Sequence, residues 1–319
     1  MDMYQKRKIR AEKKKDDSPK SFPSVGIHWY PGHMAKTRRQ ITEDLKLIDV
    51  VIEILDSRIP ISSRNPDMAE LTKNKDKIII LNKSDLADKK ENEKWVQYFK
   101  NKGQTAILAD CNIGKGINEI LRATEKIKEE EMEEYAKKGR TGRKIRAMVL
   151  GIPNVGKSSF INRVAKNSRL EVGNKPGVTR KKQWIRVNEK IELLDTPGVL
   201  WPKFESEEVA LNLCFTGTIK EEILDKIEIA YQLTKFLLEN YRKNLCERYK
   251  LEESFVEEKL AQEQPENYNI YEIILEIGKK RGCVMSGGKI DEEKTARILL
   301  DEFKNGQLGK ITIEKPKRQ

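Results

Sequence analysis

Short runs of apolar residues recur between residues 49 and 195 and alternate with polar stretches that suit helices. The runs are rich in Val, Ile and Leu, which is typical of buried strands. Strands that alternate with helices predict a mainly parallel sheet covered on both faces. Only two residues separate the last two runs, which predicts a hairpin. In chain order the runs are DVVIEILDS, KIIILNKSD, TAILADC, KIRAMVLG, QWIRV and KIELLD.

The pattern changes beyond about residue 205. Segments such as EEILDKIEIAYQLTKFLLENYRK and EEKTARILLDEF carry apolar residues at three- and four-residue spacing, which predicts helices. The charged, apolar-poor start of the chain predicts a disordered basic tail, and GKITIEKPKRQ at the other end predicts a basic tail with at most one short strand. We therefore expect a tail at 1–24, an α/β domain at 25–204 and an all-α domain at 205–319.

The composition of the chain predicts that it binds a polyanionic partner. Lysine and arginine (63) exceed aspartate and glutamate (51), which gives a net charge of +12. This favours nucleic acid first and an anionic membrane surface second, with lysine used for solubility as the alternative. No run approaches the ~18 apolar residues of a membrane span, and the N-terminal sequence lacks the apolar centre of a signal peptide, so we expect a cytoplasmic protein. Four scattered cysteines and two histidines predict neither a zinc site nor a disulfide framework.

The fourth apolar run leads into GIPNVGKSSFINRV, which holds the pattern GxxxxGKS from Gly151 to Ser158. Such a loop between a strand and a helix wraps phosphates with backbone N–H groups, and its glycines allow the close approach. Lys157 would reach the β- and γ-phosphates, and Ser158 would bind Mg²⁺. The sequence therefore predicts a phosphate-binding P-loop. The nucleotide-binding residues expected from it are Asn154, Val155, Gly156, Lys157, Ser158 and Ser159.

Two further segments would complete a site for Mg²⁺ and the γ-phosphate. KIELLDTPG places Asp195 at the end of a strand, where a carboxylate can hold Mg²⁺, usually through water, and Gly198 can sense the γ-phosphate. Thr179, in NKPGVTRKK, is a candidate second hydroxyl ligand to the metal. Neither pattern is specific alone, and Thr179 by itself would be an ordinary turn threonine. The expected Mg²⁺ ligands are thus Ser158, Thr179 and Asp195.

The nucleotide base is predicted from KIIILNKSD, where Asn82, Lys83 and Asp85 follow a buried strand in the pattern NKxD. An aspartate carboxylate accepts two hydrogen bonds from the guanine N1–H and exocyclic amine, which adenine cannot offer, and the lysine stem can pack along the nucleotide. Known GTPases supply the assignment of NKxD to guanine, and this hydrogen bonding explains it. GTP is therefore favoured over ATP.

The base motif precedes the P-loop here, whereas in most GTPases it follows. If the chain is started at IRAMVLG and the end after Asp195 is joined to residue 49, the usual order of six strands is restored. The sequence thus predicts a circularly permuted P-loop GTPase domain, which is tolerated where the old termini lie close together at the surface. Because the loop after Asp195 leads into the helical domain, we hypothesise that γ-phosphate sensing reorients that domain.

The motifs HWYPGHM, DSRIP, RNP, LNKSD, GIPNVGKSS, PGVT and DTPGVL together resemble the circularly permuted YlqF/RbgA family of ribosome biogenesis GTPases. The resemblance covers about residues 27 to 315, because TGTIK, KRGCVMSGGKID and GKITIE are similar to that family's C-terminal helical domain. It implies a GTPase that acts late in assembly of the large ribosomal subunit and binds ribosomal RNA and ribosomal proteins.

The catalytic residue is predicted from this resemblance. Val199 follows DTPG, where many GTPases have a water-orienting glutamine. The resemblance implies that His33 of PGHM substitutes for this glutamine, since a neutral imidazole could orient or deprotonate water. A surface or RNA-contacting histidine is the alternative.

Two further residues are interpreted by comparison with known GTPases. Asn154 matches the asparagine of potassium-activated GTPases and is therefore a candidate K⁺ ligand, with a turn cap as the alternative. Cys111 stands where the base-binding loop usually has serine, but that loop contributes mostly backbone N–H groups, so binding should survive.

We therefore expect a Mg²⁺-dependent GTPase that hydrolyses GTP slowly alone and faster on the large-subunit precursor, and no feature predicts an obligate oligomer. The alternative, kept open by Val199, is a passive GTP-bound RNA-binding assembly factor without significant turnover. RNA binding is expected mainly through the helical domain. The basic clusters that could contact RNA are Arg180, Lys181 and Lys182 and, farther on, Lys279, Lys280 and Arg281.

Overall fold

The structure is a computed structural model that describes residues 32–139, 142–167, 184–201, 204, 206–219, 225–262 and 268–316, with only the backbone at 32–37 and 167. Three predictions lie outside these residues. They are the disordered tail at 1–24, the metal ligand Thr179 and the basic cluster at 180–182.

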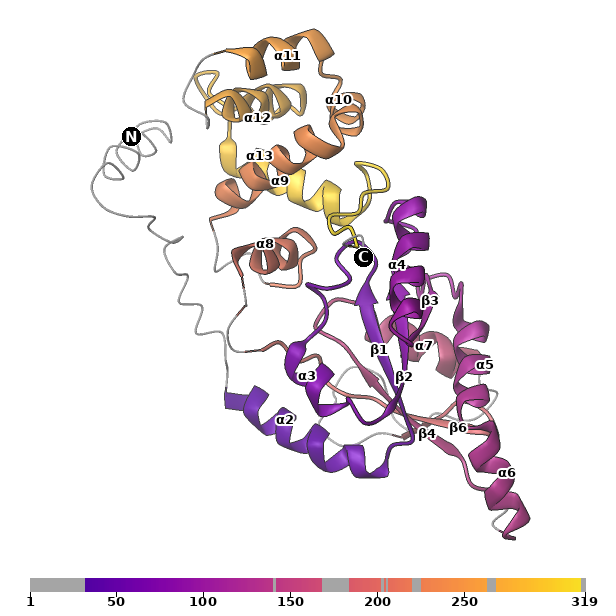
Figure 1. Cartoon of the computed structure of the whole chain (residues 1–319). Coiled ribbons are helices and arrows are strands. Elements are labelled where there is room, and N and C mark those ends of the chain that lie inside the picture. The colour runs from indigo at the N-terminus through magenta and orange to yellow at the C-terminus, as the bar shows by residue number, and fades with distance from the viewer. Residues whose placement is uncertain are drawn as a thin grey trace.

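Six strands form one sheet in the order β3-β2-β1-β4-β6-β5 (Figure 1). All neighbours are parallel except β5 and β6, whose pairing of Trp184 with Leu194 confirms the predicted hairpin. The first strand of the chain pairs with both β2 and β4, so the chain enters the sheet at its middle, as the predicted permutation requires. The strands are β1 Val50–Asp56, β2 Asp76–Asn82, β3 Thr105–Leu108, β4 Ile145–Leu150, β5 Trp184–Arg186 and β6 Ile191–Leu194.

Helices cover both faces of the sheet, as the continuous apolar runs predict. Alternate residues of a strand point to opposite faces. Val51 therefore packs with Ile41 of α2 on one face, while Val50 and Ile52 pack with Phe160 of α7 on the other. The helices around the sheet are α2 Gly32–Asp44, η1 Leu45–Leu47 (a 3₁₀ turn), α3 Pro66–Leu71, α4 Lys89–Asn101, α5 Ile117–Ile127, α6 Glu129–Lys137 and α7 Lys157–Asn167.

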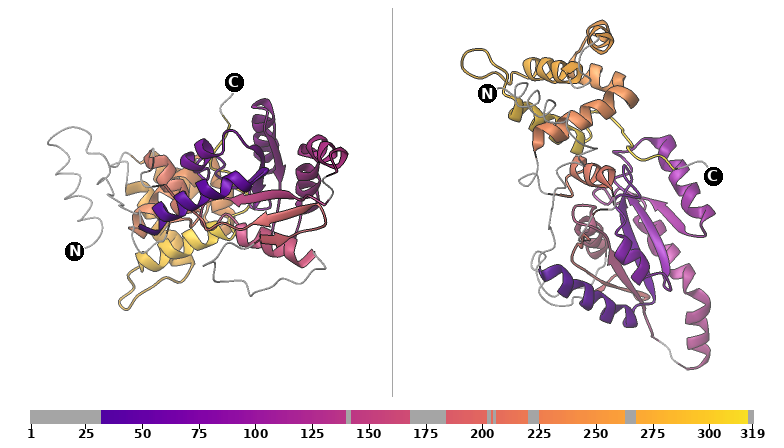
Figure 2. Two further views of the ribbon diagram at one scale, coloured as in Figure 1. Left: turned by 90° about the horizontal axis from the view of Figure 1, so that it is seen from below. Right: turned by 60° about the vertical axis from the view of Figure 1, so that its left-hand side comes forward.

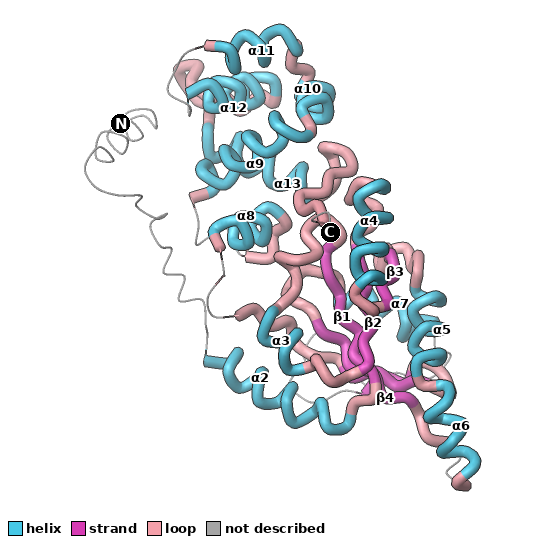
Figure 3. The backbone as a smooth tube through the Cα atoms, in the orientation of Figure 1, coloured by secondary structure: helices cyan, strands magenta, loops and turns pink. Residues whose placement is uncertain are grey.

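After β6 the described chain leaves the sheet and becomes helical (Figure 3). α9 lies at the centre of this helical region and packs against α8, α10, α12 and α13. One cluster of buried apolar residues runs from the sheet into these helices, so the two regions share a core. The division at residue 204 stays a prediction. The helices of the region are α8 Glu207–Phe215, α9 Lys226–Asn240, α10 Arg242–Tyr249, α11 Glu253–Ala261, α12 Tyr268–Lys280 and α13 Glu292–Lys304.

The prediction of a C-terminal basic tail is wrong for residues 310–316. They form no strand, but Ile311 and Thr312 are buried, and the segment passes from the helices toward α4 (Figure 2, right). Alternating small apolar and charged residues suit such packing as well as they suit solvent, so composition could not decide between the two. Among the described residues, no helix has the length and apolar character needed to cross a membrane.

Candidate functional site

The carboxyl ends of the parallel strands gather the predicted site residues at one edge of the sheet. In open α/β sheets this is the edge where ligands bind. β1 ends at Asp56 and β2 at Asn82, while β4 leads into the P-loop and β6 leads into Asp195. Because β1 and then β2 lie on one side of β4 and β6 lies on the other, the P-loop has Asp56 and the base motif on one side and Asp195 on the other.

Lys157 is held inside the P-loop by the loop's own carbonyl groups. Its ammonium donates hydrogen bonds to the oxygens of Gly151 (2.9 Å) and Ile152 (2.8 Å), and the side chain is buried. Burial lowers the pKa of Lys157 to about 8, although the charge of Asp195 acts to raise it. An anionic phosphate at this position would give the ammonium a stronger partner and favour its charged form.

Two glycines of the site lie so close to neighbouring atoms that no side chain fits. A Cβ atom built on Gly156 would lie 2.1 Å from Asn82 Nδ2, and the φ of Gly156 is +104°. A Cβ atom built on Gly198 would lie 2.8 Å from Lys157 Nζ and 2.9 Å from the backbone nitrogen of Pro153. The DTPG segment thus touches the P-loop, as a sensor of the γ-phosphate must.

Asn82 joins three of the predicted segments through its side-chain amide. Nδ2 donates to the carbonyl of Val155 in the P-loop (2.6 Å), and Oδ1 accepts from the backbone N–H of Cys111 (3.0 Å). The side chain is only 3% exposed. Asn82 therefore connects the phosphate and base segments within the protein.

Lys83 and Asp85 follow Asn82 at the surface of the same edge. Lys83 adopts a left-handed backbone conformation (φ 58°), and its ammonium lies 2.9 Å from Asp56 Oδ2. Asp85 is exposed, and no described residue hydrogen-bonds its carboxylate. The thiol of Cys111 is buried, and this burial, helped by Asp110, raises its pKa to about 12. The backbone N–H of Cys111, and not its thiol, makes the contact with Asn82, while its role in binding the base stays a prediction.

The described oxygen groups expected to hold Mg²⁺ come from the residue after Lys157 and from Asp195, whose charge interacts with Lys157. Ser158 is exposed at the start of α7, and Ser159 is half-buried beside it. Asp195 is half-buried, and this burial raises its pKa, while Lys157 lowers it. A hydroxyl and a carboxylate suit Mg²⁺, which takes its remaining ligands from water and phosphate. No group of three or more His, Cys, Asp or Glu side chains that could hold a metal occurs in the described part of the chain.

Val199 points into the core. It is 6% exposed and packs in the cluster that contains Ile41 of α2 and Met68 of α3, while its carbonyl accepts a hydrogen bond from Asn65 Nδ2 (2.9 Å). The position that holds glutamine in many GTPases is therefore turned away from the strand ends. His33 lies in the first turn of α2, where only the backbone is described, so its predicted role stays untested.

Asn154 makes a contact that the motif does not predict. Its Nδ2 donates to the carbonyl of Gly217 (2.7 Å), which lies in the turn after α8. Asn154 is exposed and left-handed (φ 63°). Its Oδ1 accepts no hydrogen bond from a described residue, and its role as a K⁺ ligand stays a prediction.

The basic cluster of α12 is partly neutralised by carboxylates. Lys279 and Lys280 are exposed, and each lies 3.8 Å from Glu276, while Arg281 pairs with Glu302. Trp201 is buried and belongs to the core.

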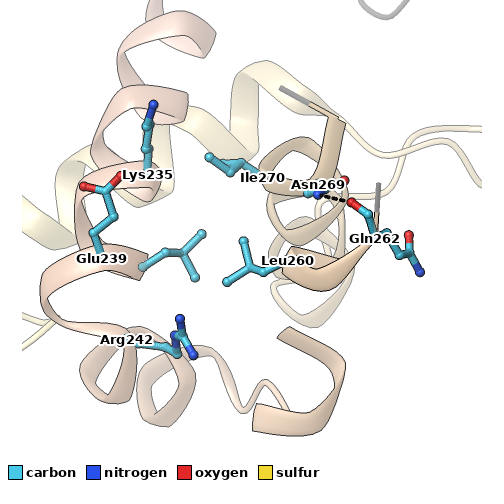
Figure 4. A pocket seen from close by; sticks show the side chains of 8 residues that line it. Lys235, Glu239, Arg242, Leu260, Gln262, Asn269 and Ile270 are labelled. Carbon is cyan, nitrogen blue, oxygen red and sulfur yellow. Dashed lines mark hydrogen bonds between the residues drawn. The ribbon is translucent and has the colours of Figure 1, made fainter. Parts of the chain in front are cut away.

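A separate hollow of about 400 Å³ lies in the helical region among α9, α11 and α12 (Figure 4). It contains none of the predicted site residues, and it lies away from the strand ends. Its lining residues are Lys235, Leu238, Glu239, Arg242, Leu260, Gln262, Asn269 and Ile270.

Several residues shape the site although no spacing pattern in the sequence marks them. Asp56 and Arg58 stand in the motif DSRIP and Gly217 stands in TGTIK, but spacing alone does not reveal what they contact. Glu314 stands in GKITIE, and its carboxylate accepts hydrogen bonds from the middle of the loop between β1 and α3 (Ile61 N, 2.6 Å).

Proteins that are named as ribosome biogenesis or ribosome-associated GTPases are similar to this chain over nearly its whole length. A Bacillus cereus protein called ribosome biogenesis GTPase A is 47% identical over 290 residues, which are 91% of this chain and 94% of the relative. The protein of that name from Thermotoga maritima is 30% identical over 292 residues (91% and 95%). The mitochondrial ribosome-associated GTPase 1 of Mus musculus is 34% identical over 320 residues (92% and 93%).

Solved structures and a family model agree with these relatives. A GDP-bound structure of TM YlqF matches with a TM-score of 0.60 at 26% identity and covers 88% of this chain and all of that one. A GNP-bound YlqF from T. maritima matches with a TM-score of 0.58 at 25% identity (89% and 100%). The family model described as 50S ribosome-binding GTPase matches residues 146–264, and the NKSD motif precedes this range, as permutation requires. The resemblance inferred from the motifs is confirmed.

Proposed function

The chain belongs to the ribosome biogenesis GTPase A family, and on that premise we propose that it binds an immature large ribosomal subunit in its GTP state and leaves after hydrolysis. Membership makes it a guanine nucleotide-binding GTPase of ribosome assembly with a ribosomal particle as partner. The choice of the large subunit, the weak basal activity and the stimulation by the particle are the proposal. A cytoplasmic location follows from such a partner.

The hydrogen bonds of Asn82 are the observation that carries the proposal. They join the P-loop and the Cys111 loop to the strand end that bears Lys83 and Asp85. One nucleotide can therefore reach the phosphate and base segments together. The free carboxylate of Asp85 would accept the guanine N1–H and exocyclic amine, which selects guanine against adenine.

The phosphates would lie against the backbone of the P-loop and the ammonium of Lys157. Ser158, Asp195 and Thr179 would hold Mg²⁺, which neutralises charge that develops on the phosphate oxygens. Asn154 would coordinate K⁺ through Oδ1 and add positive charge beside the phosphates. Gly198 would donate its N–H to the γ-phosphate and so report whether GTP or GDP is bound.

Hydrolysis requires a group that orients the attacking water. The buried side chain of Val199 cannot supply it. We therefore propose that His33 does so when the protein is bound to the ribosomal particle. The burial of Val199 also favours the second candidate, a GTP-bound RNA-binding factor that does not turn over.

Steady-state GTP hydrolysis in KCl, with and without purified large-subunit precursors, tests the proposal. We expect slow turnover alone and an increase of at least about tenfold with the particle. His33→Ala should remove the stimulation but leave GDP and particle binding intact. His28→Ala, which changes the other histidine of the chain, is the matched control and should keep the stimulation.

The outcomes separate the two candidates. If the particle still stimulates GTP hydrolysis by His33→Ala, this histidine is not catalytic, but the protein is still a particle-stimulated GTPase. Absence of turnover with a bound particle favours the passive RNA-binding factor. Replacement of KCl by NaCl should lower turnover if Asn154 holds K⁺, and Asn154→Asp should change that response.

A further inference from the structure

Two segments far apart in the sequence lie against each other at the base side of the site. One is the base loop, residues 83–88, which follows β2. The other is the C-terminal strap, residues 308–316, which follows α13 and crosses from the helices onto the sheet (Figures 1 and 2).

Two hydrogen bonds join the strap to the base loop. The N–H of Ile311 donates to the carbonyl of Leu86 (3.0 Å), and the N–H of Asp88 donates to Thr312 Oγ1 (2.9 Å). Thr312 is fully buried. The strap therefore satisfies backbone groups of the base loop that would otherwise need water, which holds the loop in one conformation.

The strap is itself anchored to the sheet region by Glu314. One carboxylate oxygen accepts the N–H of Ile61 (2.6 Å) and the other accepts the N–H of Ser62 (2.9 Å), while the Glu314 carbonyl accepts from Trp95 Nε1 (2.9 Å). Both carboxylate oxygens thus face backbone donors, an arrangement that an amide side chain cannot reproduce.

A second connection reaches the first residue of the base loop. Asp56 pairs with the ammonium of Lys83 (2.9 Å) and with the guanidinium of Arg58 (2.8 Å). Arg58 is 1% exposed and also donates to the carbonyls of Phe303 (3.4 Å) and Lys304 (3.3 Å) at the end of α13. Burial alone would raise the pKa of Asp56, but the charges of Arg58 and Lys83 outweigh it and lower that pKa below its ordinary value.

We propose, resting on the proposed function, that the C-terminal strap positions the base loop for guanine, so that guanine recognition depends on the docking of the helical region. The left-handed backbone of Lys83 is an unfavourable conformation that its surroundings must maintain. Release of the strap frees the loop to leave this conformation, and Asp85 then meets the base less often. The phosphates are held by the P-loop, which makes no bond to the strap. A partner that shifts the helical region would therefore change the affinity for guanine more than the affinity for phosphate.

The test compares two nucleotides that differ only at the base. Inosine diphosphate lacks the exocyclic amine of GDP, so the ratio of the two dissociation constants measures how well Asp85 meets the base. Thr312→Val keeps the shape of the side chain but removes the acceptor of the Asp88 N–H. We expect the preference for GDP to fall about three- to tenfold in this variant. Thr234→Val is the matched control: this buried threonine bonds only within α9, to Ala230 (2.7 Å), so its variant should keep the preference.

Glu314→Gln is the second variant, because it turns an NH₂ group toward a backbone N–H and loosens the anchor. Circular dichroism and thermal unfolding show which variants are folded. One folded variant is sufficient for the comparison of GDP with inosine diphosphate. An unchanged GDP preference in the folded variants overturns the proposal. If the unaltered protein itself binds GDP and inosine diphosphate equally, the predicted guanine site is wrong, which is a separate failure.

Discussion

The phosphate half and the base half of the nucleotide site are held in different ways. In the phosphate half, Lys157 bonds to Gly151 and Ile152, six and five residues away in the sequence. In the base half, Asp88 bonds to Thr312, 224 residues away. The bonds of Lys157 need only a strand, a turn and a helix that are consecutive in the chain, although Asn154 and Val155 of the same loop also bond to Gly217 and Asn82. The second half requires that the helical region has folded and docked.

This difference separates two kinds of control. A segment held by local bonds keeps its shape while distant parts of the molecule move, whereas a segment held by long-range contacts opens with them. The bonds that hold Lys157 in the P-loop should therefore persist when the helical region moves, whereas the bond from Asn154 to Gly217 depends on that region. The base loop should report whether the helical region is in place.

The largest expected effect comes from the point where the halves meet. Gly156→Ala places a Cβ atom 2.1 Å from Asn82 Nδ2 at a φ of +104° and should weaken GDP binding roughly 100-fold or more. Equilibrium binding of a fluorescent GDP analogue measures it. Gly103→Ala is the control: its φ is +70°, but no atom lies within 4 Å of the added carbon, so it should cost about 1 kcal/mol of stability and leave GDP binding unchanged. Comparable GDP affinity in both variants would contradict the close packing of the two halves.

The next effect belongs to the base half alone. Asp56→Asn leaves the buried Arg58 without its anionic partner and should lower the free energy of unfolding by about 3 kcal/mol in a urea titration. It should also reduce the preference for GDP over inosine diphosphate. Because the folded pKa of Asp56 is depressed, its stabilisation is present above the ordinary value of 3.8 and is lost as the pH falls below it.

Glu53→Gln is the matched control for Asp56→Asn. Glu53 is a buried carboxylate on the same strand and pairs with Arg64 (3.0 Å), away from the base loop. Its variant should also lose stability but keep the GDP preference. A lost preference in both variants would mean that stability of the sheet, and not the pairing of Lys83, sets base recognition.

A smaller effect distinguishes the phosphate half by its response to pH. The pKa of Lys157 is about 8 in the free protein, and a bound phosphate favours the charged form. GDP binding should therefore take up a proton above pH 8, and affinity should fall about tenfold between pH 7 and pH 9. Calorimetry in buffers of different ionisation enthalpy measures the uptake. Lys157→Gln should bind more weakly and lose the pH dependence; a dependence that persists in it must come from another group.

The smallest effect is expected from Cys111→Ala. The thiol is buried with its pKa raised to about 12, and only the backbone N–H of this residue bonds to Asn82. GDP affinity should change by less than about twofold. A larger loss, with normal thermal unfolding, would show that the thiol itself contacts the nucleotide.

Much of the fold and half of the site could be predicted from local patterns. The six strands, the hairpin from QWIRV to KIELLD and the permuted order follow from apolar runs and motif order, and the sheet confirms them. The P-loop could be predicted because its geometry depends on consecutive residues such as Gly156 and Lys157. The roles of Thr179 and His33 stay predictions, since the structure does not describe those side chains.

The amino-acid sequence by itself determined the strands and the phosphate loop and supplied the motif from which guanine is predicted, because each is encoded within one short segment. Tertiary structure alone decided that Val199 is buried, that Asn154 bonds to Gly217 63 residues away and that Arg58 reaches Phe303 245 residues away. It also decided that the basic C-terminal segment packs against the base loop. No local pattern encodes such pairs, because a residue's partner depends on which surfaces the whole fold brings together.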